Sequence, residues 1–324
     1  MDANNTLLSI RDLVVEYSSA GEVIHAVNGV SLELEKGRSL GLVGETGAGK
    51  TTIAKSILRI LPSPQGRVKG GEILFCGEDI LQRPESRMLE IRGEKISMIF
   101  QDPMTALNPT MTVGEQVAEV VRLHSDAGGA DAQKVALRML KRVGIMADRY
   151  HDYPYQLSGG MKQRVVIAMA LVFKPELLLA DEPTTALDVT IQAQILEVIR
   201  RYKNKFGTSM ILITHDLGIV AENCDTVAVI YAGRIVEAGT RDDVFDKPAH
   251  PYTVGLFQSL PGYSKGQKRL RPIMGLPPDP RQAPAGCSFR PRCPRAKEGC
   301  GEADIPERVL SPTHSCRCLY PEVH

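Results

Sequence analysis

One segment constrains the fold of this chain more than any other, because it joins an apolar strand pattern to a glycine loop and then to a helical pattern. Residues 39–44 (SLGLVG) are apolar enough for a short buried strand. Residues 44–51 (GETGAGKT) satisfy the phosphate-binding pattern G-x-x-x-x-G-K-[ST]. Residues 51–61 (TTIAKSILRIL) follow with helical spacing. This order of strand, loop and helix predicts an α/β chain that binds the phosphates of a nucleotide.

The residues of this loop have separate expected tasks. Its glycines allow backbone N–H groups to turn toward the phosphates. Lys50 would bring a positive charge to the β- and γ-phosphate oxygens, and the Thr51 hydroxyl would bind Mg²⁺. An ordinary glycine turn is the alternative, but the strand before the loop and the helix after it argue against that reading. The residues expected at the nucleotide are Gly44, Glu45, Thr46, Gly47, Ala48, Gly49, Lys50, Thr51 and Thr52.

A second apolar run, residues 177–181 (LLLAD), predicts a buried strand that ends in the carboxylate of Asp181. A carboxylate at such a strand end holds Mg²⁺ in phosphoryl-transfer proteins, the Walker B arrangement. Glu182 follows directly and could polarise a water molecule. By itself this acidic pair indicates only a solvated turn, but together with the phosphate loop it indicates a hydrolytic centre.

The chain also carries a second helix start that could bind an anion, residues 157–164 (LSGGMKQR). Ser158 can donate to a phosphate, and Gly159 and Gly160 allow the backbone to come close to it. The positive end of the helix dipole lies at the same place. A plain helix cap followed by two glycines is the alternative reading.

Strands alternate with helices along most of the chain, which predicts a mainly parallel sheet surrounded by helices. Residues 191–207 show an amphipathic helix that Gly207 ends. A mostly helical stretch from about 112 to 173 interrupts the alternation and indicates an inserted helical lobe. The proline-rich part after residue 260 predicts an irregular extension. The other strand patterns lie at 7–17, 23–36, 96–100 and 210–216, with a hairpin at 226–239 that turns at Ala232-Gly233.

Composition excludes several classes of protein. Lys and Arg number 39 against 38 Asp and Glu, so no basic excess suggests a nucleic-acid partner. No apolar run approaches the length of a membrane span, and the N-terminus lacks the pattern of a signal peptide. We therefore expect a cytosolic chain. Five of the seven cysteines crowd the C-terminal part, where disulfides are a poor explanation in a reducing compartment.

These features together resemble the ATP-binding subunits of ABC transporters. The motifs of that family occur in order between about residues 7 and 258: GETGAGKT, FQDP, LSGGMKQR, LLLADEP, ALD and THD. The resemblance implies a P-loop ATPase with a mixed-sheet core, an antiparallel β part at the N-terminus and an inserted helical subdomain. It divides the chain into a nucleotide-binding domain, residues 1–258, and an extension, residues 259–324.

The resemblance also assigns roles to single residues. In this family two ATPase domains pair head to tail, so that the LSGG segment of one, here Ser158, Gly159 and Gly160, contacts the ATP held by the other. Gln101 would touch Mg²⁺ and the attacking water, which Glu182 activates as general base and His215 helps to orient. Thr51, Gln101 and Asp181 are then the expected Mg²⁺ site. The remaining assignments are Tyr17 stacking on adenine and Asp188 coupling the two sites.

Within the family, residues 247–257 (KPAHPYTVGLF) and the segment MTALNP at 104–109 resemble the peptide branch of importers. We therefore expect a subunit that hydrolyses ATP to power import of di- or oligopeptides. Its implied partners are a second ATPase, by resemblance a different chain, two membrane permease subunits and, indirectly, a solute-binding protein. It would lie peripherally on the cytoplasmic face of the inner membrane. An importer of nickel or another small solute is the alternative, and an ABC ATPase acting on ribosomes or DNA is a more distant one.

The cysteines of the extension have the spacing Cys287-x₅-Cys293-x₆-Cys300, followed by Cys316 and Cys318. The spacing lacks the paired C-x₂-C of common zinc sites and does not match ferredoxin patterns, so by itself it leaves metal binding and reduced thiols open. Some dipeptide-type members of the family hold a [4Fe–4S] cluster in this tail. By that resemblance we expect a cluster on Cys287, Cys293, Cys300 and Cys318, with Cys316 as the alternate fourth ligand and zinc as the alternative metal.

Overall fold

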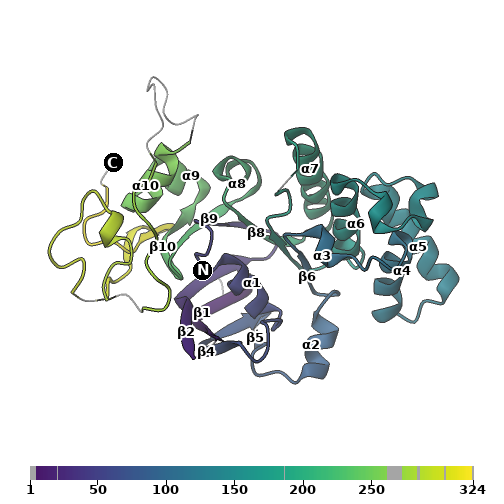
Figure 1. Ribbon diagram of the computed structural model, residues 1–324, viewed down its shortest axis with the longest axis horizontal. Coiled ribbons are helices and arrows are strands. Elements are labelled where there is room, and N and C mark those ends of the chain that lie inside the picture. The colour runs from purple at the N-terminus through teal and green to yellow at the C-terminus, as the bar shows by residue number, and fades with distance from the viewer. Residues whose placement is uncertain are drawn as a thin grey trace. The chain divides into compact units, whose positions relative to one another are not determined.

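The computed structural model describes residues 5–19, 21–185, 187–260, 272–282, 285–302 and 304–322. The chain forms two units, and both are built from separated segments (Figure 1). One consists of Met1–Asn5, Glu35–Ser39 and Gln82–Ile213, and the other of Thr6–Leu34, Leu40–Leu81 and Thr214–His324. The first holds the acidic strand end and the LSGG helix, and the second holds the phosphate loop and the cysteines.

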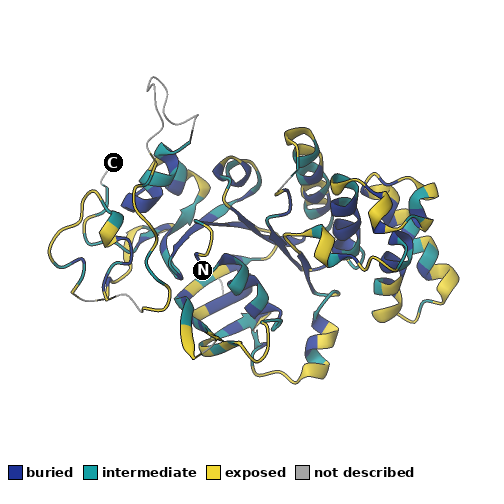
Figure 2. Ribbon diagram, in the orientation of Figure 1, coloured by how far each residue is buried: buried dark blue, intermediate teal, exposed yellow. Residues whose placement is uncertain are grey.

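Three parallel strands form the sheet of the first unit: β6 (Ile96–Ile99), β7 (Leu177–Asp181) and β8 (Ser209–Thr214), with β7 in the middle. Every residue of these strands is buried (Figure 2). Continuous apolar runs are typical of parallel strands that are covered on both faces. The pairing places the ends of β6 and β7 at one edge of the sheet, where Gln101 and Glu182 follow.

Helices make up the rest of the first unit, and most lie in the stretch expected to be helical. The helix α6 (Gly159–Leu171) packs against α3, α4, α5 and α7 and is buried on several sides. The helix α7 (Val189–Phe206) ends at Gly207, which takes the left-handed conformation (φ 68°) predicted for its stop signal. The others are α2 (Glu85–Ile91), α3 (Pro103–Ala106), α4 (Val113–Leu123), α5 (Gly129–Arg142), and the 3-10 helices η1 (Ala147–His151) and η2 (Pro154–Gln156).

The second unit contains the antiparallel N-terminal sheet, in the order β2-β1-β4-β5. The sequence patterns predicted β1 (Thr6–Ser19) and β2 (Glu22–Glu35), but not β4 (Gly66–Phe75) or β5 (Glu78–Asp79). The glycines of β4 weaken its strand pattern, and its pairing with β1 stabilises it instead.

A second group of strands in this unit carries the phosphate loop. The strand β3 (Ser39–Val43) pairs in parallel with β9 (Thr226–Tyr231), which forms the predicted hairpin with β10 (Arg234–Thr240). The helix α1 (Lys50–Ile57) follows the loop and is shorter than the stretch 51–61 predicted from its spacing. It ends early because Arg59 takes a left-handed conformation (φ 53°), which stops the helical hydrogen bonds.

The C-terminal extension is less irregular than its prolines suggest. A hairpin of β11 (Arg308–Ser311) and β12 (His314–Cys316) pairs with β10. These strands are too short to show a periodic pattern, and tertiary pairing decides them. The buried carboxylate of Glu237 in β10 accepts hydrogen bonds from Ala249 N (2.7 Å) and His250 N (2.8 Å) and contacts His314 Nε2 at 2.8 Å. The remaining helices are α8 (Leu217–Asn223), α9 (Arg241–Asp246), α10 (Pro251–Gln258) and η3 (Arg290–Arg292).

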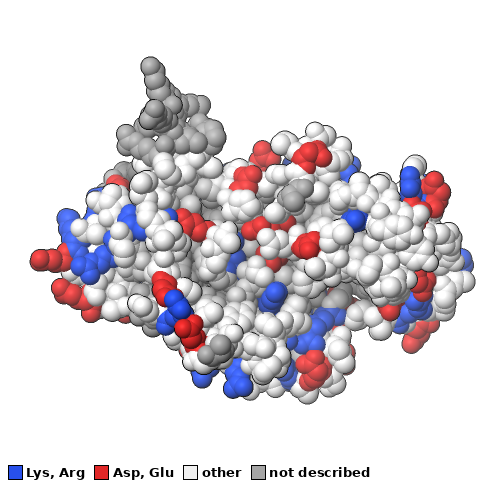
Figure 3. Space-filling view, in the orientation of Figure 1, with Lys and Arg blue, Asp and Glu red and all other residues white. Residues whose placement is uncertain are grey.

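Two surface properties bear on function. None of the helices in the described part of the chain is both long and apolar enough to cross a membrane. On the face shown in Figure 3, Lys and Arg side chains lie among Asp and Glu side chains. That mixture agrees with the nearly balanced charge of the sequence.

Candidate functional site

The phosphate loop runs from β3 to α1, and close neighbours explain two of its glycines. A Cβ on Gly44 would lie 2.2 Å from the carbonyl oxygen of Ile230 in β9. Gly49 caps α1 at φ 104°, and a Cβ there would lie 2.5 Å from the carbonyl oxygen of Ala26 in β2. The loop is thus held tightly between two strands by backbone contacts that only glycine permits.

The lysine of the loop is buried and holds the loop's own backbone. Lys50 Nζ donates to the carbonyl oxygens of Gly44 (2.7 Å) and Glu45 (3.0 Å). These bonds place a positive charge against the loop that is predicted to receive phosphates. Tyr17, the predicted adenine contact, lies in β1, and its hydroxyl is 3.2 Å from Thr52 Oγ1 in α1. The structure therefore brings this tyrosine to the end of the loop.

His215 belongs to the same unit as the loop and is exposed. It follows β8 and precedes α8, whose N-cap is Asp216. The Asp216 carboxylate accepts hydrogen bonds from Gly218 N (2.8 Å) and Ile219 N (3.3 Å). The cap fixes the turn on which His215 stands.

The acidic pair lies at the end of β7 in the other unit. Asp181 is 1% exposed, and Glu182 takes the left-handed conformation with φ 45°. Such a conformation costs about 1–3 kcal/mol for a residue with a side chain and is common at functional sites. Glu182 N donates to the carbonyl oxygen of Ile213 in β8 (2.8 Å), so the neighbouring strand fixes this turn.

Gln101 and Thr185 help to orient the side chain of Glu182. Gln101 Nε2 and Thr185 Oγ1 each lie 2.9 Å from Glu182 Oε2. The structure thus brings together Gln101 and Glu182, which the sequence singled out separately. Thr185 was not predicted, because a threonine in a turn carries no signal of its own. A carboxylate held in this way could position a water molecule or accept its proton.

The LSGG segment forms an exposed helix start. Ser158 Oγ accepts a hydrogen bond from Met161 N (3.4 Å) and so caps α6. Ser158 and Gly159 are exposed, while most of the helix behind them is buried. Asp188 caps α7 in the same manner, with Ile191 N 3.0 Å from its Oδ1. Both residues therefore have a local structural role in addition to any role toward a second subunit.

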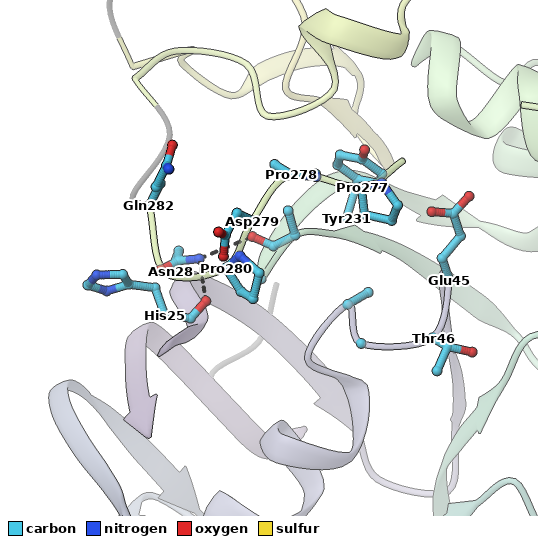
Figure 4. A pocket seen from close by; sticks show the side chains of 14 residues that line it. His25, Asn28, Glu45, Thr46, Tyr231, Pro277, Pro278, Asp279, Pro280 and Gln282 are labelled. Carbon is cyan, nitrogen blue, oxygen red and sulfur yellow. Dashed lines mark hydrogen bonds between the residues drawn. The ribbon is translucent and has the colours of Figure 1, made fainter. Parts of the chain in front are cut away.

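A cavity of about 180 Å³ lies beside the phosphate loop in the second unit. Figure 4 shows the segment Pro277–Pro280 of the extension along this cavity, with Pro277 and Pro278 near Tyr231 and Pro280 beside Asn28 and His25 of β2. Asn28 Nδ2 donates to the carbonyl oxygens of His25 (3.2 Å) and Ala232 (3.1 Å), and His25 N donates to that of Pro280 (2.8 Å). The extension thus reaches the phosphate loop, which no sequence pattern indicated.

Four cysteines of the extension line one small pocket: Cys287, Cys293, Cys300 and Cys318. Cys316 is buried elsewhere, beside Glu237, and lines a different pocket. None of the cysteines in the structure forms a disulfide. Burial raises the pKa of the Cys318 thiol to about 11 and also raises the pKa of the thiols of Cys287 and Cys293.

A buried histidine lines the same pocket. His250 is 1% exposed, and its Nδ1 accepts a hydrogen bond from Tyr252 N (3.0 Å). The proton of the neutral ring therefore lies on Nε2, which has no hydrogen-bond partner among the described residues. Burial lowers the pKa of His250 to about 4, so the ring is neutral near pH 7. A buried donor without a partner indicates that the pocket suits an acceptor.

Comparison with known protein families gives two matches. A family profile described as "ABC transporter" matches residues 27–185. A second, described as "Oligopeptide/dipeptide transporter, C-terminal region", matches residues 236–300. The first covers the phosphate loop, the LSGG segment and the acidic pair, and the second covers three of the four pocket cysteines.

Relatives match over nearly the whole chain. The "Dipeptide transport ATP-binding protein DppD" of Bacillus subtilis (strain 168) is 48% identical over 314 residues, 96% of this chain and 94% of that protein. The "Oligopeptide transport ATP-binding protein OppD" of the same organism is 48% identical over 321 residues, 98% of this chain and 90% of that protein. Both relatives include the C-terminal extension in the matched length.

Solved structures match the fold. A dimeric structure of a post-hydrolysis state of the ATP-binding cassette MJ0796, bound to ADP and Pi, has a TM-score of 0.66 and 25% identity, and the match covers 72% of this chain and 99% of that one. The structure of cbiO1 from Clostridium perfringens, described as part of the ABC transporter complex cbiONQ, has a TM-score of 0.64 and 28% identity, with 75% and 92% covered.

Proposed function

Because the chain belongs to the family of ATP-binding subunits of dipeptide and oligopeptide ABC transporters, we propose that it hydrolyses ATP to power the import of di- or oligopeptides through a membrane transporter. The observation that carries the proposal is the phosphate loop, in which Lys50 is buried against the loop carbonyls and no Cβ fits at Gly44 or Gly49. The match to the peptide-transporter C-terminal region favours a peptide over nickel as the transported solute.

In the proposed reaction a water molecule attacks the γ-phosphorus of ATP, and the bond to the β–γ bridging oxygen breaks. Glu182 positions this water and accepts its proton, and Gln101 holds the Glu182 carboxylate in place. Lys50 offsets charge on the β- and γ-phosphates, Tyr17 stacks on the adenine, and His215 contacts the γ-phosphate. The other expected contacts are the backbone and side chains of residues 44–52.

The expected Mg²⁺ site consists of the Thr51 hydroxyl, the Gln101 amide and the Asp181 carboxylate. These are hard oxygen donors, which is the ligand type that Mg²⁺ prefers. When bound, the ion offsets the negative charge of the phosphates. The buried Asp181 would supply the charged ligand of this set.

We assign Ser158, Gly159 and Gly160 to the ATP of a second ATPase subunit, and Asp188 to the coupling between the two nucleotides. The exposed start of α6 supports this, as does the similarity to a cassette described as dimeric. The other proposed partners are two membrane permease subunits, which would hold the chain at the cytoplasmic face of the membrane, and indirectly a solute-binding protein. The second ATPase is proposed to be a different chain.

We propose that the chain divides into a nucleotide-binding domain, residues 1–258, and an extension, residues 259–324. The separate family matches at 27–185 and 236–300 support this division. The second match begins in β10, before the proposed boundary. The matched C-terminal region would therefore consist of the extension together with the last strand and helices of the domain.

For the extension we propose a [4Fe–4S] cluster on Cys287, Cys293, Cys300 and Cys318. Four thiols at one pocket fit the ligand set of such a cluster, and the Nε2–H of His250 could donate to a sulfur atom. Zinc fits less well, because no three His, Cys, Asp or Glu side chains among the described residues are grouped closely enough to hold a single ion. When bound, the cluster would supply a cross-link for this segment.

The cluster has a matched pair of test variants. Iron, acid-labile sulfide and the visible absorption spectrum are measured on protein purified without oxygen. Cys318→Ser should lose most of the iron and the brown colour, whereas Cys316→Ser should keep both, because Cys316 lines another pocket. Anaerobic protein that lacks iron and colour would end the cluster proposal.

The transport function is tested by purifying the chain with its native membrane partners and placing the assembly in vesicles. We expect ATP-dependent uptake of labelled di- or oligopeptides, and no uptake when Lys50 is replaced by Ala. Co-purification with ribosomes or DNA instead of membrane subunits would contradict the proposal.

A further inference from the structure

The phosphate loop contains an acidic residue, Glu45, directly after Gly44. A carboxylate at this position would repel the negative phosphates that the loop is proposed to bind. The side chain is 27% exposed, so water screens its charge only in part. A loop of this composition needs a compensating charge close to Glu45.

Arg292 of the C-terminal extension supplies that charge. Its Nη1 lies 2.7 Å from Glu45 Oε2, and its Nη2 lies 3.0 Å from Glu45 Oε1. Two parallel hydrogen bonds between a guanidinium and a carboxylate form the strongest common ion-pair geometry. The Arg292 side chain is only 5% exposed, so this pair is better shielded than a surface salt bridge.

The guanidinium is held in place by further acceptors. Arg292 Nε donates to the carbonyl oxygen of Met274 (3.2 Å) and Nη2 to that of Ile273 (3.3 Å). Nη1 also donates to the hydroxyl of Tyr231 (3.2 Å). Hydrogen bonding to Glu45 raises the pKa of Arg292 above its ordinary value, so the group stays charged. The arginine is therefore fixed by the extension and by β9 as well as by Glu45.

The backbone of Glu45 is fixed at the same time. Glu45 N donates to the Tyr252 hydroxyl (2.9 Å), and the Glu45 carbonyl accepts from Lys50 Nζ (3.0 Å). Tyr252 is buried against the rings of Tyr231 (4.6 Å between centroids) and Phe289 (5.4 Å). Both the backbone and the side chain at the start of the loop are thus tied to neighbouring segments.

From these contacts we propose that Arg292 is a positioning residue of the nucleotide site, which neutralises Glu45 and fixes the start of the phosphate loop so that ATP can bind. The inference rests on the proposed role of the loop in binding ATP. Arg292 directly precedes Cys293, which lines the cysteine pocket. A movement of the backbone at this pocket would therefore also move the residue that holds the phosphate loop.

The test measures equilibrium binding of a fluorescent ATP analogue to the purified full chain, with Arg292→Gln as the first variant. We expect the Kd for ATP to rise about tenfold, and the defect to shrink as salt is added, because salt screens the partly exposed carboxylate. Replacing Glu45 by Gln in the same protein should restore the Kd to within about threefold of the parental value. Arg308→Gln, which removes an exposed arginine of the extension, is the matched control and should leave the Kd unchanged.

Two results would overturn the proposal: parental ATP affinity in Arg292→Gln, or failure of Glu45→Gln to restore binding in the double variant. The second result would mean that Arg292 only stabilises the fold. If Arg292→Gln does not fold, the single variant Glu45→Gln tests the proposal by itself. This variant keeps the arginine and should bind ATP at least as tightly as the parental chain. Weaker binding by that variant contradicts the charge argument. The proposed function is tested separately by ATP binding of the parental chain and its loss in Lys50→Ala.

Discussion

Replacing Glu182 by Gln separates ATP binding from ATP hydrolysis. Two donors to this side chain, Gln101 Nε2 and Thr185 Oγ1, point at one oxygen, Oε2. The amide oxygen of a glutamine can take the place of Oε2 and keep both bonds, so the unfolding free energy should change by less than about 0.5 kcal/mol. What is lost is the ability to accept a proton from water. General-base catalysis contributes about 10²–10⁴-fold to a rate, which corresponds to roughly 3–5 kcal/mol in the barrier.

The assay is single-turnover hydrolysis of ATP by the assembled transporter, with equilibrium binding of ATP measured alongside. Glu182→Gln should bind ATP like the parental chain but hydrolyse it at least about 100-fold more slowly. Thr185→Ala is the matched control, since it removes one neutral hydrogen bond to the same oxygen and should cost no more than about tenfold. Hydrolysis at the parental rate by Glu182→Gln, or an equal loss in both variants, would refute the role assigned to this carboxylate.

Two further predictions concern the phosphate loop and the packing of α7. Gly44→Ala should cost about 1–3 kcal/mol of stability and weaken ATP binding, because the added Cβ would lie 2.2 Å from a backbone oxygen. Gly47→Ala should cost only about 1 kcal/mol, because no atom lies within 4 Å of its added Cβ and only the left-handed backbone conformation is strained. Urea denaturation compares the two, and equal losses would contradict the packing argument. Burial raises the pKa of Tyr202 in α7 to about 12, and its hydroxyl donates to the carbonyl oxygen of Leu171. Since the unfolded tyrosine ionises near pH 10, this one group should make stability fall by about 1.4 kcal/mol per unit as pH rises from about 10 to 12. Tyr202→Phe should make the fall shallower by that amount, while the buried Tyr231 and Tyr252, whose pKa values are also raised, still contribute.

The contacts of the extension bear on how ABC transporter subunits of the peptide branch differ from cassettes without it. The solved cassettes cover 72–75% of this chain, whereas the peptide-transport relatives cover 96–98%. In this chain the extension supplies Arg292 to the phosphate loop and β11 and β12 to the sheet. An acidic residue can therefore occupy the second position of the loop because the extension provides its counter-charge.

The family and the fold class were predicted from the sequence and are confirmed by the family matches and by the similar solved structures. The reason is that the decisive signals are local. Residues 39–61 contain their own strand, turn glycines and helix, and the hairpin at Ala232-Gly233 and the stop at Gly207 depend only on neighbouring residues. Such features depend on steric contacts and hydrogen bonds between neighbouring residues, so they can be predicted from the local sequence.

The tertiary structure alone decided which distant residues meet. Arg292 and Glu45 are separated by 247 positions, and nothing in either neighbourhood indicates the other. Resemblance to the family favoured Cys318 over Cys316, but the cysteine spacing did not. In the structure Cys318 lines the pocket of the other three cysteines, while Cys316 lies in β12, which pairs with β10. Contacts of this kind arise from the packing of whole elements against one another. Because that packing is set by the sum of many weak interactions, no single segment of the sequence carries its signature.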